Sequence, residues 1–322
     1  MLYLLNKSNN RQNMKILTRE NIAGVWSATP TPFTDELKLD IEVIPRLVGH
    51  HLRLGVKGVF LGGTSGEGPW MSDSMRIELA REIVKSNQNR MLLAMQITDN
   101  SAMRMIENIK RIEDSGVDIA VIAPPFFQAN ATQEYLKDLY FEVIENSSLA
   151  VGVYHRGKHS SVEIETNTLE KIISHPKVVI VKDSSSDPVA REMICKATAK
   201  RKDELFALDG DEFNSVPYVE AGYDGFLFGG ACFNGFMANN ILKMAKAGNI
   251  KGAQAMRDHM NEIMTKVFGG KGLPCWLAGQ KQIMVELGIF NTRKTIINYQ
   301  ITEECINTIK SVVEQEKAYL LP

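Results

Sequence analysis

A lysine at the end of an apolar run is the side chain of this sequence best placed to do chemistry. Lys182 follows residues 178–181, Val-Val-Ile-Val, a pattern typical of a buried strand. Burial disfavours the ammonium form of a lysine, and the neutral amine can attack a carbonyl carbon. We therefore predict that Lys182 is a nucleophile that forms a Schiff base. From this residue alone, a strand-end lysine that extends into solvent is the alternative.

Other reactive groups also follow apolar runs. Residues 62–68 read Gly-Gly-Thr-Ser-Gly-Glu-Gly, and the backbone N–H groups of such a loop can hold an anion, with hydroxyl donors from Thr64 and Ser65. The loop lacks the Gly-Lys-Ser/Thr of a P-loop and the glycine order of a dinucleotide site, so alone it also fits a tight turn. Tyr154 ends another apolar run, where a half-buried core tyrosine is the alternative.

The sequence predicts alternating strands and helices, and these elements must position the reactive groups. Amphipathic helical patterns occupy residues 101–115 and 132–147, and Asp187-Pro188 begins a further helix as N-cap and first-turn proline. Between such segments, a helix repeatedly ends at a glycine and a strand begins almost at once. The expected strands are residues 24–29, 58–61, 91–96, 117–123, 149–154, 178–182, 205–209 and 224–228.

This alternation predicts an α/β fold, a (β/α)8 TIM barrel with a C-terminal helical extension. A doubly wound open sheet is the alternative, but residues 28–33, Ala-Thr-Pro-Thr-Pro-Phe, cannot begin the helix that a nucleotide site needs there. We expect an N-terminal extension at 1–23, the barrel at 24–232 and a wholly helical region at 233–322. In such barrels the chemistry lies at the C-terminal ends of the strands, where Lys182 and Tyr154 fall.

Composition narrows the class of protein. The chain has 322 residues, 44% hydrophobic and 23% charged, with a net charge of −1, which is ordinary for a globular protein. The sequence has no run of five like charges and no apolar stretch of 18 residues. We therefore expect neither a nucleic-acid partner nor a membrane partner. The four cysteines form no CxxC motif and are typical of reduced thiols in a cytoplasmic protein. The apolar N-terminal run at 1–5 is too short for a signal-peptide core.

Four motifs together resemble the dihydrodipicolinate synthase/N-acetylneuraminate lyase superfamily. They are Gly-Thr-Ser-Gly-Glu at 63–67, Val-Tyr at 153–154, Val-Ile-Val-Lys-Asp at 179–183 and Gly-Asp at 210–211. The resemblance extends from about residue 24 to about residue 249, and more loosely to the end. It implies a class I, pyruvate-type lyase. Lys182 would attack the C2 ketone of a 2-oxo acid, and the resulting iminium would allow a C3–C4 bond to break or form.

The resemblance also implies roles for the other residues. Tyr154 would shuttle protons, Thr64 would hydrogen-bond it, and Thr64 and Ser65 would hold the substrate carboxylate. It implies no metal and no cofactor beyond the lysine, and a homotetramer built as a dimer of dimers. The predicted catalytic residues are Lys182, Tyr154 and Thr64, and the predicted substrate-binding residues are Gly63, Thr64, Ser65, His159, Asp211 and Leu227.

The sequence departs from the synthase pattern at two places. A Pro-Tyr-Tyr element usually follows the fourth strand, but here Phe127 stands at the second tyrosine's place and has no proton to give. His159 stands where those synthases carry a substrate-binding arginine; Arg156 or Lys158 could substitute, or the stretch could be a solvated loop. A metal site at His155 and His159 is disfavoured because no carboxylate partner lies nearby in sequence.

These departures favour a Schiff-base lyase or aldolase that acts on pyruvate or a related 2-oxo acid, such as a 2-oxo-3-deoxy sugar acid or a neuraminate-like substrate. The first alternatives are dihydrodipicolinate synthase proper and a non-catalytic relative that binds a 2-oxo acid. A metal-dependent barrel aldolase or a phosphate-binding isomerase ranks last, because its expected ligands are missing.

Overall fold

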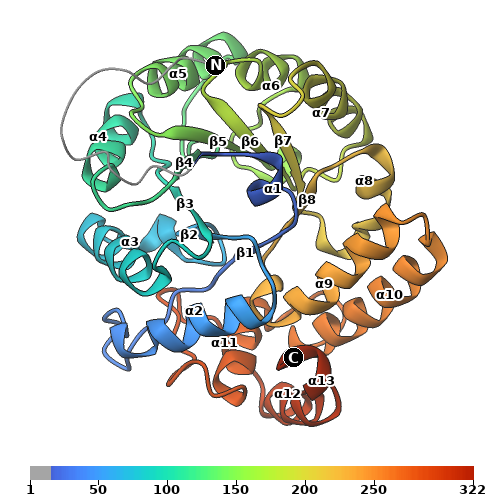
Figure 1. Ribbon diagram of the computed structural model, residues 1–322. Coiled ribbons are helices and arrows are strands. Elements are labelled where there is room, and N and C mark those ends of the chain that lie inside the picture. The colour runs from blue at the N-terminus through green and yellow to red at the C-terminus, as the bar shows by residue number, and fades with distance from the viewer. Residues whose placement is uncertain (1–15) are drawn as a thin grey trace.

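Eight parallel strands close into a barrel in the computed structural model, which describes residues 16–322 (Figure 1). Neighbours in the barrel are neighbours in sequence, and β8 pairs with β1. The predicted TIM barrel is confirmed, and each strand lies inside its expected range or extends one residue beyond it. The strands are β1 Val25–Ala28, β2 Gly58–Leu61, β3 Leu92–Gln96, β4 Ile119–Ile122, β5 Ala150–His155, β6 Val178–Asp183, β7 Phe206–Asp209 and β8 Gly225–Phe228.

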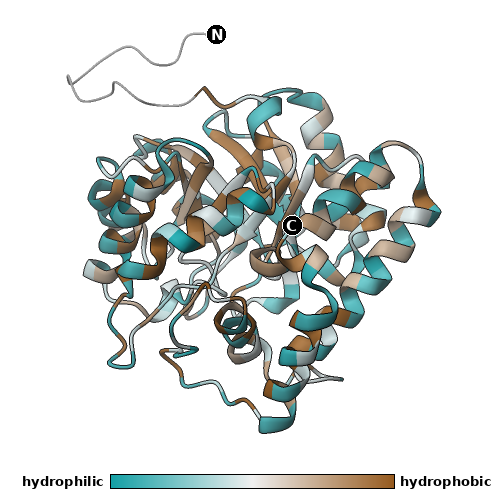
Figure 2. Cartoon of the chain, turned by 60° about the horizontal axis from the view of Figure 1, so that its bottom comes forward, coloured by the Kyte–Doolittle hydropathy of each residue, from teal (hydrophilic) through white to brown (hydrophobic). Residues whose placement is uncertain are grey.

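A ring of helices covers the outside of the barrel, with apolar residues toward the strands and polar residues outward (Figures 1 and 2). Local capping explains where several begin: the Thr132 hydroxyl accepts from the Tyr135 N–H, and Asp187 Oδ1 accepts from the Val189 N–H at 2.9 Å. The helix predicted at Pro188 is therefore present. The ring comprises α2 Ile44–Arg53, α3 Asp73–Asn87, α4 Ala102–Ile112, α5 Gln133–Glu145, α6 Thr166–Ile173, α7 Pro188–Lys200, α8 Val216–Ala221 and α9 Ala231–Lys246.

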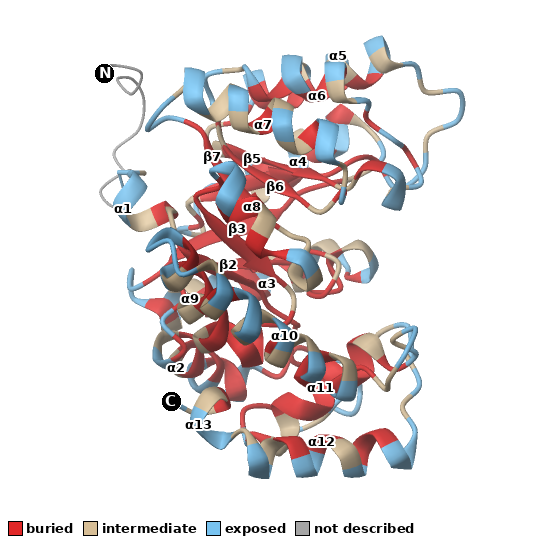
Figure 3. Cartoon of the chain, turned by 90° about the vertical axis from the view of Figure 1, so that its right-hand side faces the viewer, coloured by how far each residue is buried: buried red, intermediate tan, exposed pale blue. Residues whose placement is uncertain are grey.

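Apolar side chains fill the inside of the barrel and close its N-terminal end. The inner cluster includes Trp26, Phe206 and Ile22, which has no solvent exposure. Ile22 ends the short helix α1 (Arg19–Ile22), which lies over the middle of the barrel in Figure 1, and its carbonyl accepts from Trp26 Nε1 at 2.8 Å. Nearly every strand residue is buried (Figure 3). In barrels of this kind a polar site lies at the C-terminal ends of the strands. Most of the predicted N-terminal extension, residues 1–15, lies outside the described residues.

The C-terminal region adds four helices beside the barrel. They are α10 Ile250–Val267, α11 Trp276–Glu286, α12 Glu303–Gln315 and α13 Lys317–Leu320. The predicted boundary between residues 232 and 233 falls within α9, which packs on β1 and β8. The expectation of a wholly helical region is wrong for residues 287–302, which form no helix because their groups bond to the barrel loops; Thr292 Oγ1, for example, donates to the Phe33 carbonyl. No helix among residues 16–322 is long and apolar enough to cross a membrane.

Candidate active site

Lys182 and Tyr154 lie side by side at the C-terminal ends of β6 and β5. They are register partners across the two strands, and Lys182 Nζ lies 4.2 Å from the centroid of the Tyr154 ring and 5.5 Å from that of Phe60. Lys182 follows Ile180 in the strand alternation, and Ile180 belongs to the inner cluster. Only 7% of Lys182 is exposed, so the alternative of a solvated strand-end lysine is wrong. The amine faces the mouth of the barrel.

The Tyr154 hydroxyl sits among groups that favour its ionised form. Burial alone would raise the pKa of Tyr154. The positive charges of Lys182 and Arg156 outweigh burial and lower the pKa below its ordinary value. Hydrogen bonds from the hydroxyls of Ser184 and Thr64 act in the same direction. A tyrosine in these surroundings can release and recover a proton more readily than one in water.

The glycine-rich loop between β2 and α3 presents Thr64 and Ser65 to this mouth. Ser65 is buried and Thr64 half-buried. The loop is folded tightly on itself, since a methyl group added to Gly68 would lie 1.9 Å from the Gly62 carbonyl oxygen. The Gly68 N–H donates to the Gly63 carbonyl at 3.3 Å. Two hydroxyls and a constrained, glycine-rich backbone thus lie in one loop, and the Thr64 hydroxyl reaches the Tyr154 hydroxyl.

Gly210 marks a close approach of the β7 loop to the lysine. A methyl group there would lie 2.0 Å from Ser184 Oγ and 2.9 Å from Lys182 Cε. Ser184 follows Asp183 at the end of β6 and was not predicted as a site residue. Its position directly after the strand was the only signal that could have found it.

Glu212 is the acidic group beside the site, and it too was not predicted. Its Oε2 accepts from the Gly230 N–H at 2.9 Å, and its Oε1 would lie 3.4 Å from a methyl group on Gly229, which Ser65 Oγ also borders. Burial raises the pKa of Glu212 to about 7, against the opposing effects of the Gly230 hydrogen bond and the positive charge of Lys182. An acid whose pKa lies near neutral pH can both donate and accept a proton under physiological conditions.

The remaining predicted residues lie in different surroundings. The Asp211 carboxylate accepts from Ser186 Oγ at 2.9 Å, and Leu227 is buried in the inner cluster. His159 is exposed in the 3-10 turn Gly157–His159. Arg156 is half-buried instead, with its guanidinium carbon 6.0 Å from the Tyr154 ring centroid. The structure therefore brings Arg156, rather than His159, next to Tyr154.

The family follows from comparison with known proteins. The model of the Dihydrodipicolinate synthetase family matches residues 21–303 of this chain. The chain belongs to that family. The predicted superfamily is confirmed, and with it the prediction of an enzyme of the dihydrodipicolinate synthase/N-acetylneuraminate lyase type.

Several family members are similar over most of their length. The 4-hydroxy-tetrahydrodipicolinate synthase of Listeria innocua is 25% identical over 250 residues, which cover 77% of this chain and 84% of the relative. The dihydrodipicolinate synthase structure from Bacteroides thetaiotaomicron has a TM-score of 0.82 at 24% identity, covering 91% of this chain and 98% of that one. The prophage protein YagE of E. coli, solved with pyruvate, has a TM-score of 0.82 at 18% identity, covering 92% and 99%. The two structures show the shared fold.

One departure from the synthase pattern is visible at the surface. Phe127, which the sequence resemblance sets at the place of a family tyrosine, is 73% exposed, and its backbone N–H donates to Asn100 Oδ1 at 2.9 Å. The neighbouring Phe126 is 37% exposed. These two rings lie in the loop between β4 and α5 and carry no hydroxyl, so they have no proton to deliver to a site.

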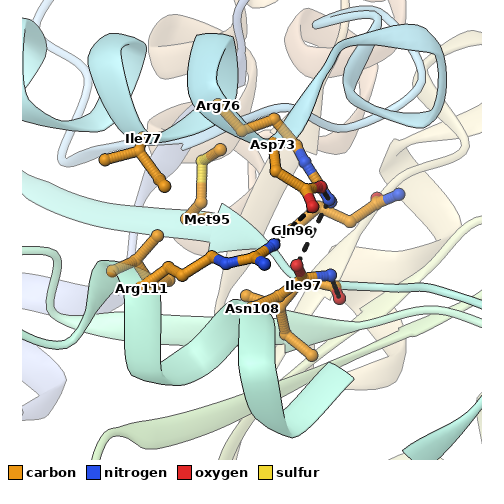
Figure 4. Close-up of a pocket in the computed structure, with 9 residues that line it drawn as sticks. Asp73, Arg76, Ile77, Met95, Gln96, Ile97, Asn108 and Arg111 are labelled. Atoms are coloured by element: carbon orange, nitrogen blue, oxygen red, sulfur yellow. Dashed lines mark hydrogen bonds and ion pairs between the residues drawn. The ribbon is translucent and has the colours of Figure 1, made fainter. Parts of the chain in front are cut away.

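A second polar cluster, between α3, β3 and α4, is structural (Figure 4). Asp73 forms ion pairs with both Arg76 and Arg111, and Arg76 donates to Asn108 Oδ1 at 3.3 Å. Asn108 in turn donates to the Ile97 carbonyl. The cavity they line holds about 10 Å³, roughly the room for one water, so the cluster fixes α3 against α4. Among residues 16–322, no three His, Cys, Asp or Glu side chains gather in a metal-binding group.

Proposed function

We propose that this protein is a Schiff-base-forming lyase in which Lys182 attacks the C2 carbonyl of pyruvate or a related 2-oxo acid. The single observation that supports it most is the burial of Lys182 beside Tyr154 at the mouth of the barrel. The carbinolamine that forms would lose water to give an iminium. That cation draws electrons from C3, so the C3–C4 bond breaks or forms through an enamine.

The neighbouring groups have roles that match their surroundings. Tyr154 would donate a proton to the departing hydroxyl of the carbinolamine and recover it from the next intermediate, a task that its lowered pKa favours. Ser65 and Thr64 would hold the substrate carboxylate with the loop backbone. Gly63 and Leu227 would line the pocket, while Asp211 and His159 remain predicted substrate contacts. Glu212 would be a proton donor or acceptor for the second substrate.

The relatives support one choice of second substrate. Those described above that are named as enzymes are synthases, so 4-hydroxy-tetrahydrodipicolinate synthesis from pyruvate and an aldehyde is the first candidate. The names of the relatives agree better with this synthase reaction, the first alternative predicted from the sequence, than with cleavage of a sugar acid. A lyase of 2-oxo-3-deoxy sugar acids or neuraminate-like substrates is the second candidate. Phe127 favours it, because a relay that needs a tyrosine hydroxyl at that place is missing.

Reductive trapping tests the Schiff base directly. Borohydride with pyruvate should add one pyruvate-derived mass to the wild-type chain and none to Lys182→Ala. Lys177→Ala is the matched control, because Lys177 Nζ donates to the Ser147 carbonyl near the start of β6, at the opposite end of the barrel, and this variant should label fully. Labelling of Lys182→Ala, or no labelling of the wild type at saturating pyruvate, would refute the proposal.

Turnover separates the candidate substrates. Formation of 4-hydroxy-tetrahydrodipicolinate supports the first candidate, and pyruvate release from a panel of 2-oxo-3-deoxy sugar acids supports the second. Trapping without turnover of either would favour a non-catalytic 2-oxo-acid-binding relative. A homotetramer is proposed on the family resemblance and on the exposed rings of Phe126 and Phe127, and light scattering of the purified protein measures it. A cytoplasmic location stays a prediction.

A further inference from the structure

A fully buried ion pair connects the loop of Thr64 and Ser65 to the C-terminal helices. Glu67 Oε1 lies 2.5 Å from Lys281 Nζ, and neither side chain is exposed to solvent. Burial lowers the pKa of Lys281 to about 8, against the opposing charge of Glu67, so the amine is still charged at neutral pH. Burying two charges is costly even when they are paired. The pair is therefore weak evidence for added stability, and its role is better inferred from the segments that it connects.

The pair holds three separate segments against the loop. Glu67 Oε2 accepts from the Ile296 N–H at 2.6 Å, and Lys281 Nζ donates to the Lys294 carbonyl at 2.6 Å. The same Nζ lies 4.3 Å from the centroid of the Phe33 ring, in the loop after β1. The non-helical segment 287–302 and α11 are thus both joined to the mouth of the barrel. In segment 287–302, backbone groups of Lys294 and Ile296 bond to this ion pair and not to each other in a helix.

Glu67 belongs to the glycine-rich loop, residues 62–68, so contacts of its side chain also restrain the backbone of that loop. Its φ is 58°, a left-handed conformation that is uncommon for a residue other than glycine. Its N–H donates to the Thr64 carbonyl at 3.2 Å, and the preceding Gly66 carbonyl accepts from Thr31 Oγ1 at 2.6 Å. A displacement of the Glu67 side chain would therefore move Thr64 and Ser65 as well.

Gln280, the residue before Lys281, is bonded to the loop that follows β8. Gln280 has no solvent exposure, and its Nε2 donates to the Gly229 carbonyl at 2.6 Å. Gly229 borders both Ser65 Oγ and Glu212 Oε1. Consecutive residues of a helix point in different directions, so one turn of α11 reaches two loops of the catalytic face. Helix α11 is buried without interruption through residues 277–284 (Figure 3).

We propose that Lys281 and Gln280 are positioning residues, and that α11 holds the substrate-carboxylate loop and the loop after β8 in their binding geometry. Neither residue touches the reacting atoms. The assignment of a carboxylate to this loop rests on the proposed function, whereas the positioning of the loop does not. The C-terminal region is accordingly part of the active-site scaffold.

Lys281→Met tests the proposal with two readouts. Amide hydrogen exchange at residues 62–68 should quicken at least tenfold, because the loop loses its anchor. The pyruvate concentration that half-saturates borohydride trapping should rise at least tenfold, because small misplacements of binding groups are costly. Lys177→Met, which removes another lysine bonded to backbone carbonyls, should change neither readout. Unchanged exchange at 62–68 in Lys281→Met would overturn the proposal, whatever the wild type does with pyruvate.

The double variant Glu67→Gln/Lys281→Met covers the case in which the single variant fails to fold. It removes both charges, so the buried unpaired carboxylate that destabilises Lys281→Met is absent. Its melting temperature should recover toward that of the wild type, while fast exchange at 62–68 should persist. Wild-type exchange in this double variant would mean that Lys281 only neutralises Glu67, which would also overturn the proposal. If wild-type protein is not trapped with pyruvate, the proposed function fails and the exchange result still decides the positioning role.

Discussion

Glu212 makes the stability of this protein depend on pH in a direction that can be worked out in advance. Its pKa rises from an ordinary value of 4.5 to about 7 in the folded chain, mainly through burial. Between these two values the folded state binds a proton that the unfolded state has already lost. Stability therefore falls as pH rises from about 4.5 to about 7, and the loss is complete above the folded pKa.

The size of the effect follows from the shift. A difference of about 2.5 pKa units corresponds to about 3 kcal/mol in the free energy of unfolding, which is an upper bound because Glu212 keeps some exposure to solvent. Glu212→Gln cannot ionise and retains an oxygen that can accept from the Gly230 N–H. We expect the variant to match the wild type at pH 4 and to be more stable by up to about 3 kcal/mol at pH 8.

Urea unfolding at pH 4 and pH 8, at one protein concentration, measures both differences. Glu192→Gln is a control of opposite sign, because a hydrogen bond from Lys196 lowers the pKa of the exposed Glu192. That carboxylate favours the folded state at pH 8, so its variant should lose a little stability there. A stability gain of Glu212→Gln that is the same at both pH values would refute the reasoning. The wild-type pH–rate profile should also show a limb near pH 7 that the variant lacks.

Three further substitutions test other parts of the structure. Gly210→Ala should slow borohydride trapping at least tenfold, since its methyl group displaces Ser184 Oγ and Lys182 Cε; trapping at the wild-type rate would contradict this. Tyr154→Phe should lower kcat by about a hundredfold with little change in the KM for pyruvate, because it removes a proton carrier and leaves the carboxylate loop intact; equal changes in both would point to a binding role. Ile22→Ala should destabilise the chain by about 2–5 kcal/mol in urea unfolding while leaving trapping of the folded protein unchanged, because Ile22 fills the far end of the barrel.

The barrel could be predicted because its signals are local. Parallel strands covered on both faces are short apolar runs, and each helix that ends at a left-handed glycine, such as Gly222 before β8, marks the next strand. Lys182 and Tyr154 stood out for the same reason, since each ends such a run. Their proximity then followed from the parallel closure of the strands.

The rest of the site depends on loop geometry that adjacent residues do not reveal. Asp211 and Glu212 are neighbours in a turn, and only the folded loop shows that Glu212 meets the Gly230 N–H while Asp211 turns toward Ser186. The contact between Glu67 and Lys281 joins positions far apart in the chain, and no periodicity predicts it. The region 233–322 was expected to be wholly helical, but tertiary hydrogen bonds hold segment 287–302 in a non-helical course.

Strand alternation explains why the carboxylate next to Lys182 in sequence does not pair with it. An ion pair stabilises the ammonium form of a lysine, which cannot attack a carbonyl. Asp183, next in sequence, points to the outer side of the strand, where it accepts from Tyr223 Oη at 2.8 Å and Ser185 Oγ at 2.7 Å. Among residues 16–322, the Glu212 carboxylate feels the charge of Lys182, but the two side chains form no ion pair. A shift of β6 by one residue would exchange the two side chains, so the proposed chemistry depends on the register with Tyr154 as much as on the identity of the lysine.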